Sequence, residues 1–161
     1  MRRLVSAAAV LAMLAVTPVA AADQPVREGL PSEDFTLDAA ICGFPVDVNI
    51  LTNNEFITTF SSGNQIITGR LIVELSGNGK TITEQISGPV FITTDESGTT
   101  TVTLTGTSLL FFSPGELGPG SEGLLLLTRG PVTLVFGESG IQSFDRTSAS
   151  TVDVCAVLAD P

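Results

Sequence analysis

The sequence predicts an all-β protein folded as a single antiparallel meander β-barrel of about seven or eight strands. Apolar and polar residues alternate over many short stretches, as they do in strands that bury one face. Clusters of Gly, Asn, Asp and Ser separate these stretches and favour hairpin turns. Four of the stretches also carry a glycine near the middle, which indicates bending of the sheet. A two-sheet β-sandwich is the alternative.

The first residues have the pattern of a secretory signal peptide. Arg2 and Arg3 form a basic tip, residues 4–16 are apolar, and the small residues 19–22 resemble a cleavage site. The apolar part is shorter than the ~20 residues that a membrane-spanning helix needs. Cleavage after Ala22 leaves 139 of the 161 residues, so we expect one secreted domain without a membrane span. General secretion and twin-arginine export both remain open.

The next segment, 23–40, is polar, contains two prolines and has no clear period. We therefore expect a flexible N-terminal lead-in, with Phe35 and Leu37 held against the body. The β-barrel domain then covers 41–161. Its first strand is expected over 42–50, where apolar and polar residues alternate, and Pro45 suits an edge or a strand start.

The remaining strands follow in order between turn signals. The turns are rich in Gly, Asn, Asp and Ser, and the longest loop is 113–123. Residues 152–158 fit either a strand or a short helical turn. The 19 Thr and 13 Ser among the 139 residues suit strand surfaces that face solvent. The expected strands are 56–60, 65–75, 81–94, 99–112, 124–136 and a last one from 141 towards 151.

The four glycines inside the strands narrow the architecture. Glycine weakens a strand unless the strand bends sharply or another backbone approaches closely. These four recur about once per hairpin and lie on the more apolar face, as expected at the bends of a tightly curved barrel. They are Gly69, Gly88, Gly106 and Gly130.

The more apolar face of the strands predicts the lining of a barrel lumen. An apolar lumen in an exported protein favours the binding of a small apolar ligand, which is our first hypothesis for function. The expected lining residues are Val46, Val48, Leu71, Val73, Val102, Leu104, Val132 and Leu134.

Three runs break the alternation because both of their faces are apolar: 71–73, 109–112 and 124–127. Such runs need cover on both sides. The lead-in and the 113–123 loop are the expected cover, and contact between copies in a homo-oligomer is the alternative. An envelope-associated structural protein that self-associates is therefore one further hypothesis.

Composition excludes several kinds of chemistry. The chain has no His, Trp or Tyr, which excludes a Ser-His-Asp triad, a Cys-His pair and an imidazole-ligated zinc. It also has no Gly-rich phosphate loop, nucleophile elbow or metal-spaced cluster, so we expect no cofactor, metal or catalytic residue. Signal cleavage removes two of the seven basic residues and none of the 17 acidic ones, giving a net charge of −12. Such an acidic protein repels nucleic acid.

A carboxylate that faces inward keeps catalysis as an alternative. Glu84 falls on the face expected to be inner, where burial raises the pKa of a carboxyl and suits it to acid–base chemistry. The alternative function is therefore a cyclase- or isomerase-like barrel enzyme. Arg70 and Arg129 adjoin two of the glycines and are expected to point away from the apolar face, towards surface acids.

Two cysteines, Cys42 and Cys155, lie near opposite ends of the mature chain. An even number of cysteines in an exported protein predicts a disulfide. In the chain-entropy model the bond closes a loop of about 113 residues and contributes on the order of 4–5 kcal/mol. We expect it to clamp the first strand to the end of the chain.

The segments around these cysteines resemble those of a group of small secreted bacterial proteins. The chain carries the motif CGFPV at 42–46, preceded by FTL at 35–37, and the motif DVC at 153–155. The resemblance implies a β-rich body between the two motifs and no function, since that group has no assigned activity. More loosely, the meander is similar to the barrels of allene oxide cyclases, dirigent proteins and lipocalins, which bears on fold alone.

Overall fold

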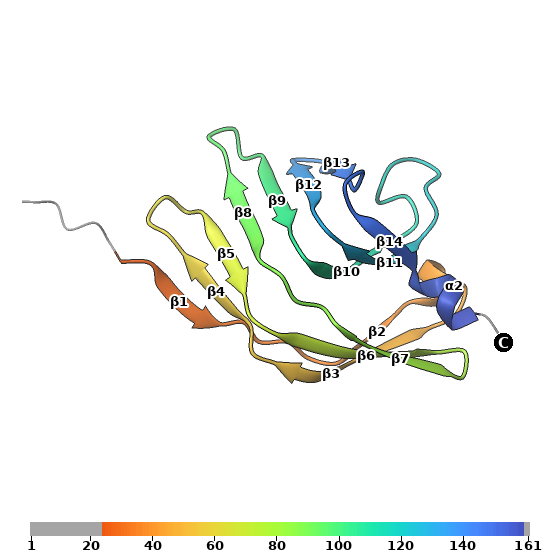
Figure 1. Ribbon diagram of the computed structural model, residues 1–161. Coiled ribbons are helices and arrows are strands. Elements are labelled where there is room, and N and C mark those ends of the chain that lie inside the picture. The colour runs from red at the N-terminus through yellow and green to blue at the C-terminus, as the bar shows by residue number, and fades with distance from the viewer. Residues whose placement is uncertain (1–23, 160–161) are drawn as a thin grey trace, which may run out of the picture.

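The computed structural model describes residues 24–159, so the expected signal peptide lies outside the described residues. The described part is built from fourteen strands and two short helices, and every strand pairing is antiparallel. The strands form sheets of seven, four and three strands (Figure 1). The predicted all-β class and antiparallel pairing are confirmed.

The chain runs back and forth in seven passes, and each pass consists of two consecutive strands, from β1 and β2 to β13 and β14. The largest sheet contains one of the two strands of every pass. In spatial order its strands are β1 (Val26–Gly29), β4 (Phe56–Thr59), β5 (Gln65–Thr68), β8 (Val90–Thr94), β9 (Thr100–Leu104), β12 (Val132–Gly137) and β13 (Gly140–Asp145). Neighbours in this sheet follow the order of the passes along the chain, which is the predicted meander.

The other half of each pass lies in one of the two smaller sheets. The four-stranded sheet is β2 (Phe35–Leu37), β3 (Val46–Asn53), β6 (Leu71–Gly77) and β7 (Lys80–Gln85). The three-stranded sheet is β10 (Thr107–Phe112), β11 (Leu124–Arg129) and β14 (Ser150–Asp153). The meander therefore divides between its fourth and fifth passes, where β7 and β10 belong to different sheets.

The seven passes agree with the expected number of about seven or eight strands, but each pass is two strands instead of one. Among the described strands no sheet closes on itself, because the second halves of the passes separate into two groups. A sandwich-like arrangement thus describes the fold as well as a barrel does.

The mid-strand glycines mark the places where four passes change sheets. Gly69, Gly106 and Gly130 have φ angles of +142°, +115° and +110°, which favour glycine. At Gly88 a Cβ atom would meet the Thr105 carbonyl oxygen and would lie 2.9 Å from Gly106 Cα. The expected bends and close backbone approaches are both present. We call the line that these four glycines form across the meander the crease.

Two hydrophobic cores lie on either side of β11. The side chains of Leu125 and Leu127 are buried in the first core, and Leu124 packs against the second. The first core comprises Leu37, Ile41, Val46, Val48, Val73, Leu75, Leu125, Leu127, Val154 and Leu158. The second comprises Leu104, Phe112, Val132 and Leu134. The chain itself therefore covers both faces of the apolar run 124–127, mainly with other strands.

Two strands lie within the segment expected to be a flexible lead-in. β1 pairs with β4 and β2 pairs with β3. The side chain of Asp34, between these strands, accepts a hydrogen bond of 2.7 Å from the Ile50 backbone N–H. Leu37 is buried, and the ring of Phe35 lies 5.9 Å from that of Phe111 on β10. Backbone pairing and these apolar anchors order a segment whose polar composition indicates a loop.

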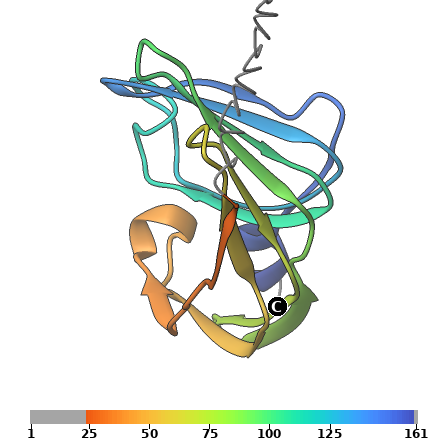
Figure 2. The same cartoon turned by 90° about the vertical axis from the view of Figure 1, so that its left-hand side faces the viewer.

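Two helices close the end of the first core. Helix α1 (Ala39–Cys42) follows β2, and Asp38 caps it by accepting a 2.7 Å hydrogen bond from the Ala40 N–H. Helix α2 (Val154–Ala159) contacts β6, β7 and β11, so it lies between the two smaller sheets (Figure 2). The residues that fit either a strand or a helical turn thus divide between β14 and α2. No helix within residues 24–159 has the length and apolarity needed to cross a membrane.

The predicted pairing of Cys42 with Cys155 is confirmed, but Cys42 belongs to α1 and not to the first expected strand, since β3 begins at Val46. Cys42 at the end of α1 is bonded to Cys155 in α2, and their Cα atoms are 5.1 Å apart. The bond joins the two helices beside the buried side chains of Ile41, Val154 and Leu158.

Candidate functional site

A pocket lies at the crease, where the fourth and fifth passes separate. Its volume is about 130 Å³. The residues that line it come from four consecutive passes: Glu55, Leu71, Ile86, Gly88, Val90, Leu104, Thr107, Ser108 and Leu109. We call it the crease pocket.

The division of the sheets explains why this pocket exists. Near Gly88 the two passes are still joined, by hydrogen bonds from Thr105 N–H to the Pro89 carbonyl (2.9 Å) and from Thr107 N–H to the Ser87 carbonyl (3.2 Å). Beyond these bonds β7 pairs only with β6, and β10 pairs only with β11. The space that opens at the fork is bordered by partly buried apolar side chains, so the pocket is mostly apolar.

Glu55 is the titratable residue of the pocket lining. It lies between β3 and β4, where its backbone N–H donates to Asn53 Oδ1 (2.9 Å) and its carbonyl accepts from the Leu30 N–H (2.9 Å). Within residues 24–159 its carboxylate oxygens have no hydrogen-bond or ion-pair partner. Burial raises the pKa of Glu55 above its ordinary value of 4.5. A half-buried, unpaired carboxyl in an apolar pocket is a candidate functional group.

Sequence reasoning nominated Glu84 as the inward carboxylate and missed Glu55. Glu84 does not line the crease pocket; its carboxylate lies 3.6 Å from the Arg129 guanidinium. The available signal was Gly69, because a glycine inside an expected strand indicates that another backbone approaches closely. The structure shows that this backbone is residues 54–55, in the break between β3 and β4. A Cβ at Gly69 would lie 2.6 Å from Glu55 Cα, so this glycine permits the close approach of the Glu55 backbone.

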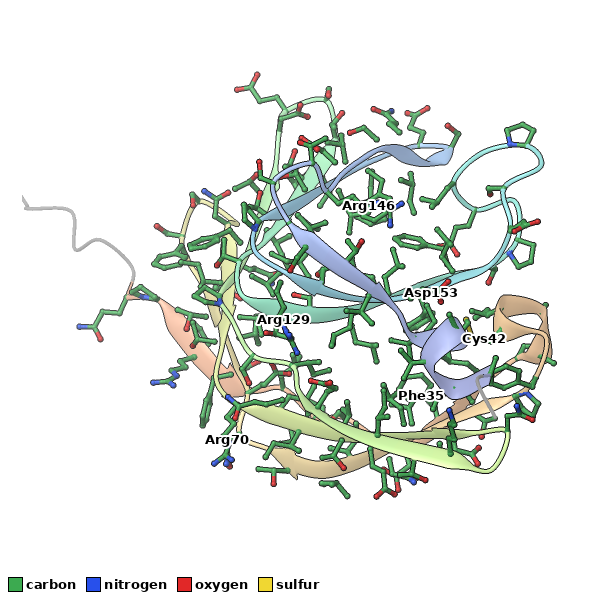
Figure 3. All side chains as sticks on the ribbon, turned by 45° about the vertical axis from the view of Figure 1, so that its right-hand side comes forward. Phe35, Cys42, Arg70, Arg129, Arg146 and Asp153 are labelled. Atoms are coloured by element: carbon green, nitrogen blue, oxygen red, sulfur yellow. A yellow bond between two sulfur atoms is a disulfide. The ribbon has the colours of Figure 1, made fainter. Side chains whose placement is uncertain are left out.

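The Arg129–Glu84 pair flanks the pocket. Thr107, which lines the pocket, is directly opposite Arg129 in the β10–β11 register. Figure 3 shows Arg129 in the interval between the three- and four-stranded sheets. Arg129 therefore pairs with an acid, as expected, but on the side of the first core and not away from it. The side chains are 59% and 27% exposed, so the pair contributes less than about 1 kcal/mol.

The residues expected to line a lumen separate into two groups. Val46, Val48 and Val73 are buried in the first core with Leu71 against them, whereas Leu104, Val132 and Leu134 are buried in the second with Val102 against them. The crease pocket brings together one residue of each group, Leu71 and Leu104.

Several larger hollows lie elsewhere, and two of them have volumes of about 500 Å³ each. One is bordered by the 113–123 loop and the β12–β13 hairpin, and the other by the same loop and the disulfide. Glu55 lines neither of them. Glu55 borders two hollows: the crease pocket and one of about 410 Å³ between residues 29–31 and 53–56. Of these two, the crease pocket is the one that lies at the fork of the sheets.

No protein family model, curated protein or solved structure matches the chain. Among residues 24–159 no group of three or more His, Cys, Asp and Glu side chains is arranged to hold a metal ion.

The raised pKa of Glu55 makes a prediction for stability. The folded state holds the Glu55 proton more tightly than the unfolded state, so this carboxyl costs stability once pH rises above 4.5 and through its higher folded-state pKa. Glu55→Gln is therefore expected to unfold at higher denaturant concentration than the unsubstituted protein at pH 7, with no gain below pH 4. Urea titrations at both pH values measure this difference. Glu96→Gln, which removes an exposed charge in the β8–β9 turn, is the control; an equal gain in both variants would contradict the prediction.

Proposed function

We propose that the protein binds a small, mainly apolar ligand in the crease pocket. The observation that carries the proposal is the apolar lining of the pocket together with the unpaired carboxyl of Glu55. Ligand sites typically combine apolar walls with a few polar groups that orient the ligand. The proposal keeps the expected ligand class and replaces the expected lumen with a pocket between sheets.

The volume limits the size of the ligand. An apolar cavity of about 150 Å³ binds benzene in a well-studied case. The crease pocket, at about 130 Å³, therefore suits one six-membered ring, with any polar substituent directed towards Glu55. Long acyl chains and fused ring systems exceed this volume.

Benzyl alcohol is a suitable neutral probe, and its binding is measured by titration calorimetry or by changes in protein NMR spectra. Val90→Phe places a larger side chain in the pocket lining and is expected to weaken binding by roughly tenfold or more. Val152→Phe, on the exposed part of β14, is the matched control and is expected to bind as the unsubstituted protein does.

Equal binding by the two variants, or no binding by the unsubstituted protein, would overturn the proposal. Val90 also packs against the second core, so the far-ultraviolet circular dichroism and unfolding curve of each variant are recorded first. If Val90→Phe does not fold, Val90→Ile makes the same test with a smaller increase in volume.

Acid–base catalysis by Glu55 is the second candidate function. A carboxyl whose pKa is raised in an apolar pocket is suited to move protons to and from a bound substrate. Cyclohexanone separates this function from binding alone, because only an acid–base enzyme speeds exchange of its α-protons in deuterium oxide. The same exchange rate with the protein and with Glu55→Gln would exclude catalysis by this group.

Secretion also belongs to the proposal. The disulfide, and a described region without a membrane-crossing helix, are compatible with it. The sequence pattern of residues 1–22 carries the proposal itself. Cover of the exposed Phe111 by a second copy stays a prediction, for which light scattering on the purified protein gives the oligomeric state.

A further inference from the structure

The carboxylate of Glu55 lacks a partner of opposite charge. Within the described residues no hydrogen bond and no ion pair compensates for the partial burial of this carboxylate. The Arg129 guanidinium does not line the pocket and lies 3.6 Å from the Glu84 carboxylate. Partial burial without a neighbouring positive charge disfavours the ionised form of this carboxyl, and a cation that enters the pocket offsets that cost.

We propose that the ligand of the crease pocket is a small organic cation, with its apolar body against Leu71, Leu104 and Leu109 and its ammonium group on the Glu55 carboxylate. This inference rests on the proposed function and adds the charge of the ligand to it. An ammonium group supplies N–H donors to the two carboxylate oxygens, which only accept hydrogen bonds when ionised.

The charge of the whole protein favours the same ligand. The net charge of the sequence is −10, with 17 acidic and seven basic residues. Such an excess attracts cations and repels anions over distances near the Debye length. An anionic ligand would face both this field and the Glu55 carboxylate.

Three probes with one ring and different charges test the inference at pH 7: benzylamine, benzyl alcohol and benzoate. The expected order of affinity is benzylamine, then benzyl alcohol, then benzoate, with benzylamine at least about tenfold tighter than the alcohol. Glu55→Gln is expected to remove most of the preference for benzylamine while leaving benzyl alcohol binding within about threefold. Glu96→Gln removes one negative charge, as Glu55→Gln does, but lies outside the pocket lining. This variant is expected to keep the preference for benzylamine.

The outcomes separate this inference from the function on which it rests. If benzyl alcohol and benzylamine bind equally and Val90→Phe weakens both, the pocket binds ligands and the inference of a cation is wrong. If benzoate binds most tightly, the inference of a cation is again wrong. If none of the three probes binds, the proposed function fails together with the inference. Loss of the preference in Glu96→Gln as well as in Glu55→Gln would assign it to net charge and overturn the role of Glu55.

Discussion

Replacing both cysteines, as Cys42→Ser with Cys155→Ser, is expected to lower the free energy of unfolding by about 3–5 kcal/mol. The disulfide joins residues 113 positions apart, and a loop of that length restricts the unfolded chain strongly. It also ties α1 to α2 beside the first core, so that Ile41 and Leu158 stay buried. Guanidinium unfolding curves of the two proteins measure the difference.

The reduced, unsubstituted protein serves as the control for the serine hydroxyls. Its unfolding midpoint in the presence of a reductant is expected to match that of the double variant. A loss below about 1 kcal/mol in both would show that the first core holds the chain ends together without the disulfide.

Gly88→Ala is expected to destabilise the protein by about 3 kcal/mol or more. A Cβ at this position would overlap the Thr105 carbonyl oxygen and would lie 2.9 Å from Gly106 Cα. Both of these atoms belong to the backbone, so the overlap can be removed only if the fourth and fifth passes separate at the crease. Since Gly88 also borders the pocket, the variant is expected to lose ligand binding if it folds.

Gly29→Ala is the matched control for this substitution. A Cβ at Gly29 would have nothing within 4 Å, and Gly29 is not among the glycines with positive φ. Its expected effect is between zero and a gain of about 1 kcal/mol, because alanine restricts the unfolded chain. Similar unfolding curves for the two variants would contradict the close packing of passes at the crease.

Local patterns predict much of this fold. The alternation over 42–50 and 65–75 places Val46, Val48 and Val73 in the first core, as expected for one buried face. The glycines inside strands indicate bends, and the two cysteines indicate the bond between the chain ends. The alternation and the glycines depend on a residue and its near neighbours, and the disulfide follows from the presence of two cysteines in the sequence.

The division of the meander into three sheets is not a local property. It depends on which passes remain paired beyond the crease, and therefore on packing between distant side chains such as Phe35 and Phe111. Alternation shows that Leu104 and Leu71 face the same side of a sheet but does not show that their sheets diverge. For that reason the lumen expected from the pattern becomes two cores and one small pocket.

The sequence does not identify Glu55 as a pocket residue, because its burial also depends on packing between distant parts of the chain. Its position in a short break between strands is typical of an exposed turn residue, whereas Glu84 lies on an alternating strand face. At the crease Glu55 is nevertheless partly buried, although its neighbours Asn54 and Phe56 are exposed. Glu84 instead lies beside Arg129. The local indication of this site was Gly69, because a glycine inside a strand permits another backbone to approach closely.

Intermolecular nuclear Overhauser effects show whether a ligand occupies the crease pocket. In protein with labelled leucine, isoleucine and valine methyl groups, bound benzylamine is expected to give contacts from its ring to Leu71, Leu104 and Leu109, which line the pocket. Contacts confined to Ile66, which lines a separate hollow with Phe60 and Phe91, would contradict binding in the crease pocket, as would an absence of contacts at saturating probe.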